Sequence, residues 1–179
     1  MKKTNLYIAM SLDGYIADIK GGVDWLAGDG SQPDHPGTYG EFFKGIDTLI
    51  LGHRTYRQIV EELSPGDWVY KGAKTYVLTR DEAKLSDSSQ DIIFTNEDPQ
   101  DLINRLRAQP GKKIWLAGGG RLVNSFIDLD EVDIFTIALI PILLGRGIGL
   151  FDTRDRPIAL ELIKTKTYNG IVELEYKKR

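Results

Sequence analysis

Three consecutive glycines, Gly118, Gly119 and Gly120, stand between an apolar run and an arginine, Arg121. The run before them, Ile114–Ala117, predicts a short buried strand, and the apolar residues after them recur with the period of a helix. Strand, tight turn and helix therefore follow one another. Such a turn leaves backbone N–H groups free at the positive end of a helix, where an anion can bind. The missing side chains would also let a phosphate or a ring approach the main chain closely.

A turn that merely needs the positive φ of glycine is the alternative explanation, although one or two glycines would serve that purpose. Two familiar phosphate-binding motifs do not fit this stretch. A Rossmann turn requires its third glycine at Val123, and a Walker loop requires Gly-Lys-Ser/Thr, which is absent. The turn is therefore predicted to hold a nucleotide in another way.

Two further turns carry groups of the same kind. Residues 52–55, Gly-His-Arg-Thr, follow an apolar run and open a segment of helical period, so a glycine, a cation and a hydroxyl meet at a predicted helix start. Thr55 could instead cap that helix, which makes this motif weak by itself. Thr79 and Arg80 end another predicted strand. Because the carboxyl ends of parallel strands share one edge of a sheet, the three turns together predict an anion-binding edge.

The chain alternates predicted strands and helices up to residue 127 and is rich in strands after it, with a strong hairpin signal at Asn169-Gly170. This order predicts an α/β fold with a mainly parallel mixed sheet, helices on both faces and a C-terminal antiparallel hairpin at one edge. Without repeats or a linker, residues 1–179 are interpreted as one domain. The predicted strands are residues 6–11, 48–51, 74–79, 91–95, 113–117, 132–140, 158–167 and 171–176.

A segment rich in Gly, Asp and Pro runs to about Gly37 and predicts a long loop, which in a compact domain is usually functional or mobile. Trp25 either anchors this loop to the core or closes over a ligand. Thr38 and Glu41 have the spacing of a capping box and predict a helix start. The helix that begins at residue 53 is expected to bury apolar side chains as far as Leu63.

The composition narrows the possible functions. A net charge of −3 gives no reason to expect nucleic acid or a membrane surface as a partner. No apolar run approaches the roughly 20 residues of a membrane helix, and Asp13-Gly14 interrupts the first apolar segment, so we expect no signal peptide. The absence of cysteine excludes disulfides and thiol chemistry and fits a cytoplasmic protein, and two histidines are too few for a histidine-rich metal site.

With its three turns in this order along the sequence, the chain resembles the dihydrofolate reductase fold over roughly residues 4–176. Within that superfamily, Ser-x-Asp-Gly-x-Ile-Ala near the start and Pro-x-Leu-Leu-Gly-x-Gly near the end are typical of the reductase domain of riboflavin biosynthesis, the RibD C-terminal branch, in its stand-alone form. The stretches that carry the resemblance are Ser11–Ala17, Gly52–Tyr56, Leu78–Arg80, Ile114–Ile127, and Pro141–Gly147 with Phe151.

The sequence differs at one position from classical dihydrofolate reductase and at another from the riboflavin branch. In classical dihydrofolate reductase a carboxylate early in the helix after the mobile loop pairs with the pterin, and here that position falls at or near Tyr39. Glu41 would point about 200° away from Tyr39 on a helix. Folate is therefore not the expected substrate, and no side chain is expected to replace the missing acid. Tyr15 stands where the riboflavin branch often carries a lysine or arginine.

The resemblance implies an NADPH-dependent reductase of the 5-amino-6-(5-phosphoribosylamino)uracil reductase type, acting on a small cyclic molecule as a homodimer. It implies a cis peptide between Gly118 and Gly119, and substrate contacts for Trp25 and Tyr39. The positions implied to bind the cofactor are Ala9, Ile16, Gly52, His53, Arg54, Thr55, Leu78, Thr79, Arg80, Gly118, Gly119, Gly120, Arg121, Leu122 and Val123.

Two questions stay open at this point. Asp13 is the one acid placed beside the nicotinamide, so it is the candidate catalytic residue, while capping of the turn at Asp13-Gly14 is the alternative role. Water is then the expected proton source. A protein that binds NADP(H) without turnover is the alternative function, and a true dihydrofolate reductase is a weaker one.

Overall fold

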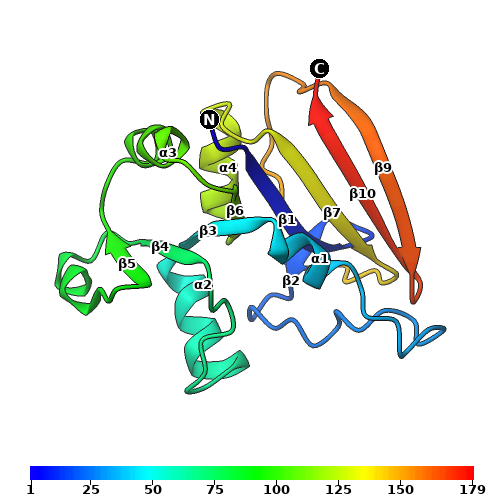
Figure 1. Cartoon of the computed structure of the whole chain (residues 1–179). Helices are drawn as coiled ribbons and strands as arrows, with labels where there is room; N and C mark the ends of the chain where they lie inside the picture. Colours follow the sequence, from blue (N-terminus) through cyan, green and yellow to red (C-terminus); the bar gives the residue numbers. More distant parts are fainter.

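The computed structural model describes all 179 residues and is organised around one large sheet (Figure 1). A separate pair of short strands, β2 (Tyr15–Ala17) and β8 (Ile148–Gly149), lies outside it. The strands of the large sheet are β1 (Thr4–Ser11), β3 (Ile46–Gly52), β4 (Lys74–Leu78), β5 (Ile92–Thr95), β6 (Lys113–Gly118), β7 (Ile134–Ile140), β9 (Leu160–Tyr168) and β10 (Ile171–Lys178). The helices are α1 (Tyr39–Lys44), α2 (His53–Gln58), η1 (Ile59–Leu63), η2 (Glu82–Asp87), α3 (Pro99–Ala108) and α4 (Gly120–Asp128).

The eight strands lie in the order β5-β4-β3-β6-β1-β7-β10-β9. Every pair from β5 to β7 is parallel, and β10 is antiparallel to both β7 and β9. Figure 1 shows the β9–β10 hairpin at one edge of the sheet and β5 at the other. The α/β class, the mainly parallel mixed sheet and the C-terminal antiparallel hairpin are thus confirmed.

Helices cover both faces of the sheet, as predicted. On one face α3 and α4 contribute Leu106 and Phe126 to a cluster that includes Leu6 of β1. On the other face Phe42 of α1 packs against a second cluster that contains Trp115 of β6. Burial of these apolar side chains is the main force that holds the helices on the sheet.

Local signals explain where several elements begin and turn. The Asp98 carboxylate accepts a hydrogen bond from the N–H of Gln100 at 2.9 Å and caps α3, with Pro99 in the first turn. Asn169 and Gly170 have φ values of 48° and 73°, the positive angles that a tight two-residue hairpin turn requires. These features follow from neighbouring residues alone, and the sequence predicts them correctly.

Two local predictions are wrong. Thr38 caps nothing, because its hydroxyl turns inward to Tyr7 and Glu173, and the Glu41 carboxylate accepts a hydrogen bond from Lys166 instead of closing a capping box. The helix after Gly52 becomes a π-helix at η1, which changes the direction of its side chains and leaves Leu63 53% exposed.

The segment between β2 and α1 contains no helix or strand, as the loop prediction requires. The segment is nonetheless fixed at several points. The indole N–H of Trp25 donates to the carbonyl of Gly22 at 3.2 Å, and the N–H of Asp29 donates to the carbonyl of Asn169 at 3.0 Å. None of the helices has both the length and the apolar character needed to cross a bilayer.

Candidate cofactor and substrate site

The carboxyl ends of four neighbouring parallel strands, β4, β3, β6 and β1, meet at one edge of the sheet. Gly52 pairs with Leu78, and Leu51 pairs with Gly118, so the three glycine and arginine turns lie next to one another. We call residues 52–55, 78–80 and 118–123 the rim. The expectation that these three turns share one edge is therefore confirmed.

The glycine turn has the conformation that the resemblance implies, with a cis peptide between Gly118 and Gly119. Gly118 has a φ of +120°, a value that residues with side chains rarely adopt. The N–H groups of Leu122 and Val123 donate to the carbonyl of Gly119 at 3.0 and 3.1 Å and close the first turn of α4. The positive end of that helix therefore opens directly onto the rim.

The surroundings of the turn show why it contains only glycine. A Cβ on Gly119 would lie 3.1 Å from Oγ1 of Thr55, and a Cβ on Gly120 would lie 2.9 Å from the carbonyl of Gly149 and 3.5 Å from Cδ1 of Ile16. Thr55 and Ile16 therefore approach the turn from two different elements. Around Gly52, by contrast, a Cβ would meet no atom within 4 Å, so open space lies beside the start of α2.

Three arginines at the rim, Arg54, Arg80 and Arg121, have exposed side chains and form no ion pair. Thr79 beside Arg80 is buried, and its hydroxyl accepts a hydrogen bond from the N–H of Asp81 at 3.1 Å. Unpaired guanidinium groups next to a helix N-terminus are suited to phosphate. The group that the rim can hold is therefore a phosphorylated ligand.

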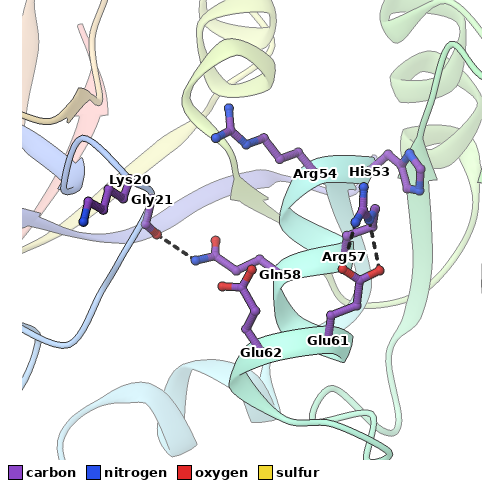
Figure 2. Close-up of a pocket in the computed structure, with 8 residues that line it drawn as sticks. All are labelled: Lys20, Gly21, His53, Arg54, Arg57, Gln58, Glu61 and Glu62. Carbon is purple, nitrogen blue, oxygen red and sulfur yellow. Dashed lines mark hydrogen bonds and ion pairs between the residues drawn. The ribbon is translucent and has the colours of Figure 1, made fainter.

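A groove of about 290 Å³ lies between α2 and the long loop (Figure 2). Lys20 and Gly21 face α2 across it, and the amide of Gln58 donates to the carbonyl of Gly21 at 2.7 Å. On the helix side Arg57 pairs with Glu61 at 2.9 Å, whereas Arg54 remains free. No sequence pattern indicates Lys20 or Gln58, because their proximity depends on how the loop folds back.

The residues expected at the nicotinamide divide into two groups. Ala9 lies in β1, a central strand with partners on both sides, and yet it is only half-buried, as is Ile16. A small, partly open position there leaves room for a ring above the sheet. Val123 differs, because its side chain is fully buried in the core and its N–H is already bonded within α4. Its side chain therefore supports the turn from behind, while Leu122 is half-buried at the edge of the same core.

Asp13 uses both carboxylate oxygens to join two loops. Oδ1 accepts from the hydroxyl of Ser11 at 2.6 Å and from the N–H of Leu144 at 3.1 Å, and Oδ2 accepts from the N–H of Gly145 at 2.7 Å. These hydrogen bonds, with that from Ser11 the largest contribution, hold the pKa of Asp13 below its ordinary value. The geometry favours the structural role for this residue over the catalytic one.

The two residues expected to contact substrate lie on the face that α1 covers. Trp25 packs against a small cluster that contains Ala9 and Ala138, so the loop reaches the sheet beside the proposed nicotinamide position. Tyr39 lies 5.8 Å from the ring of Trp115 and 5.6 Å from that of Phe43, measured between centroids. Burial raises the pKa of Tyr39 to about 12, so its hydroxyl is neutral in the physiological range.

Sequence reasoning missed an acid in this region. Glu173 of β10 is 6% exposed, and its carboxylate accepts a hydrogen bond from the hydroxyl of Thr38, the residue directly before α1. Thr38 also bonds the hydroxyl of Tyr7 at 2.8 Å. A buried acid therefore lies beside the start of α1, and whether it acts in place of the missing carboxylate stays a prediction. Alternation along β10 is the only sequence signal, and it cannot say which face a helix covers.

Comparison with known proteins agrees with this architecture. The profile of the RibD C-terminal domain family matches residues 2–172. Among relatives, the uncharacterized protein YwjB of Bacillus subtilis (strain 168) is 40% identical over 175 residues, which cover 98% of this chain and 97% of YwjB. Nearly the whole chain is therefore matched by the family and by this relative.

Solved structures show the same fold. The "Putative riboflavin biosynthesis protein" of Shewanella sp. PV-4 has a TM-score of 0.85 and 26% identity, covering 99% of both chains. A diaminohydroxyphosphoribosylaminopyrimidine deaminase/5-amino-6-(5-phosphoribosylamino)uracil reductase from Thermotoga maritima has a TM-score of 0.73 and 14% identity, covering 99% of this chain and 57% of that one. Dihydrofolate reductase from Enterococcus faecalis, with a TM-score of 0.64 and 16% identity, covers 98% of this chain and 96% of the enzyme. The last two show the fold alone.

Proposed function

The chain belongs to the RibD C-terminal domain family, and from this we propose that it is an NADPH-dependent reductase acting on a small nitrogen heterocycle. The observation that carries the proposal is the convergence of the glycine turn with Thr55 and Ile16, next to three unpaired arginines. A dinucleotide phosphate needs close main-chain approach and several cations, and the rim offers both. Family membership and the Shewanella structure support a reductase of the riboflavin biosynthesis type.

Each part of the rim has a distinct role in this proposal. Residues of the glycine turn and the start of α2 bind the pyrophosphate, and Arg54 and Arg80 bind the 2′-phosphate that distinguishes NADPH from NADH. Ala9 and Ile16 border the nicotinamide and orient it against the substrate. When bound, NADPH supplies the hydride from C4 of its nicotinamide ring.

The proposed substrate class rests on the family and on the residue at the start of α1. The position of the carboxylate of classical dihydrofolate reductase falls at or near Tyr39, which argues against folate. The proposed substrate is of the 5-amino-6-(5-phosphoribosylamino)uracil type, with the proton that accompanies the hydride taken from water. The second candidate, a protein that binds NADP(H) without turnover, is favoured by Asp13, because both of its carboxylate oxygens already accept hydrogen bonds that join two loops.

One experiment separates these functions. The purified chain is titrated with NADPH by calorimetry, and NADPH oxidation is then followed at 340 nm with 5-amino-6-(5-phosphoribosylamino)uracil, its dephosphorylated form and 7,8-dihydrofolate. We expect tight NADPH binding and turnover of an aminouracil. Binding without turnover across the panel would establish the second candidate, and no NADPH binding would overturn both.

A further inference from the structure

Glu173 lies in a row of the sheet that leads directly to the proposed nicotinamide position. In the register of β1, β7 and β10, Ala9 pairs with Ala138, and Ala138 pairs with Glu173. Directly paired residues point to the same face of a sheet, so all three side chains lie on the face that carries α1. Trp25 packs against the cluster that contains the two alanines, and the Glu173 carboxylate reaches Thr38 beside it.

Three hydroxyl and carboxylate groups form a chain there. Thr38 donates its single hydroxyl hydrogen to Glu173, so the hydroxyl of Tyr7 must donate to Thr38 across their 2.8 Å contact. Burial, with the charge of Glu173 as a smaller contribution, raises the pKa of Tyr7 well above its ordinary value and keeps it a donor. The chain therefore holds the carboxylate of Glu173 in one position.

The carboxylate of Glu173 is buried without a cation of its own. It forms no ion pair, because Lys166, which lines the same region, pairs with Glu41 at 2.9 Å. A buried carboxylate can accept several hydrogen bonds and is costly to bury without them. The hydrogen bond from Thr38 uses only part of this capacity, so the carboxylate can also accept donors from outside the protein.

A groove of about 200 Å³ gives access to the carboxylate. It runs between α1 and the β9–β10 hairpin, and its lining includes Tyr7, Thr38 and Glu173 together with Asn5. Asn5 is 4% exposed, and its side-chain Oδ1 has no hydrogen-bond partner in the protein. The groove thus presents the Oδ1 of Asn5, a buried acceptor without a donor, which is an uncommon feature in a folded protein, together with the carboxylate of Glu173, which accepts from Thr38.

We propose that Glu173 is a substrate-binding residue that takes over the place of the acid missing from α1. Its carboxylate accepts hydrogen bonds from a ring N–H and the adjacent exocyclic N–H of a nitrogen heterocycle, a donor pair that matches the two carboxylate oxygens. A 6-aminopyrimidinone ring carries this pair. The inference rests on the proposed reductase function and names the group that would orient its substrate beside Ala9.

The test uses two probes that differ in the exocyclic donor, 6-aminouracil and 6-methyluracil. Each is titrated by calorimetry into the full chain, with and without NADPH, for the wild type, Glu173→Gln and Glu173→Asp. Glu161→Gln is the control, because Glu161 is an exposed residue of β9 outside the groove and its substitution makes the same change in charge. Melting temperatures check that every variant folds.

We expect the wild type and Glu161→Gln to bind 6-aminouracil at least tenfold more tightly than 6-methyluracil. Glu173→Gln should lose this preference, and Glu173→Asp, whose carboxylate is shorter, should lose part of it even if the glutamine variant does not fold. A preference that survives in Glu173→Gln, or that is absent from the wild type, overturns the proposal. NADPH affinity, measured in parallel, reports on the reductase function separately, because Glu173 lies outside the rim.

Discussion

The hydroxyl oxygen of Thr55 lies 3.1 Å from the position that a Cβ atom on Gly119 would occupy. That distance is shorter than an ordinary van der Waals contact, so α2 and the glycine turn already approach each other as closely as they can. Two turns that are distant in sequence thereby form one wall of the rim. Any atom added between them must displace either Thr55 or a bound ligand.

Replacing Gly119 with alanine is expected to weaken NADPH binding at least tenfold, a loss of about 1.4 kcal/mol or more. The new methyl group would take up ligand space and press on Thr55. The melting temperature should fall by only a few degrees, because the φ of −75° at Gly119 suits alanine. Calorimetric titration and thermal unfolding measure the two effects.

Gly40→Ala serves as the control for Gly119→Ala, because a Cβ there meets no atom within 4 Å. The double variant Gly119→Ala/Thr55→Ala identifies the cause of the loss. If removing the Thr55 hydroxyl restored NADPH affinity, the clash within the protein, and not lost ligand space, would explain the effect.

Arg80→Ala should weaken NADPH binding by roughly tenfold or more and leave NADH binding nearly unchanged. The exposed guanidinium has no partner in the protein and is available to the 2′-phosphate, and a charge-assisted hydrogen bond contributes about 1.5–3 kcal/mol. Arg179→Ala is a matched control, since it removes the same charge directly after β10, which is separated from β4 by four strands of the sheet. Equal losses for NADPH and NADH would refute the role given to Arg80.

Asp13→Asn is expected to lower the melting temperature at pH 7 and to leave turnover within twofold of the wild type. The carboxylate has a folded-state pKa below its ordinary value, so its stabilising effect is present above about pH 4. That effect is lost as the pH falls through the lower folded-state pKa. The difference in melting temperature between the two proteins should therefore shrink in acid.

Asp24→Asn, which changes an exposed carboxylate of the long loop without a hydrogen-bond partner, controls for charge alone. A kcat reduced about 100-fold with an unchanged melting temperature would instead make Asp13 the catalytic acid.

Gln58→Ala should loosen the long loop from α2. The lost hydrogen bond from Nε2 to the carbonyl of Gly21 contributes on the order of 1 kcal/mol, so NADPH affinity is expected to fall about fivefold. Hydrogen exchange should accelerate at residues 18–24 and stay constant in the β9–β10 hairpin. Gln100→Ala, at the first turn of α3, is the control, and unchanged exchange in Gln58→Ala would show that the contact does not hold the loop.

Much of the fold is encoded locally and can be predicted from the sequence. The cap at Asp98, the Asn169-Gly170 turn and the strand–glycine–helix stretch each depend on residues a few positions apart. The expectation that the three turns share one edge of the sheet also follows from the order of predicted strands and helices, because parallel strands align their carboxyl ends. The substrate residues Trp25 and Tyr39 and the cofactor contacts remain predictions, although the structure brings the turns together.

The α/β class, the parallel sheet with its hairpin and the three turns of the rim can be predicted from the sequence, because hydrophobic period and glycine placement act over short range. Three contacts depend on how the whole chain packs: Thr38 bonds Glu173 instead of capping α1, Asp13 binds the loop at Gly145, and Gln58 bonds Gly21. In each of these pairs a polar group is satisfied by a partner distant in sequence. Polar groups in strands and loops have many possible partners, and the packing of whole elements selects among them.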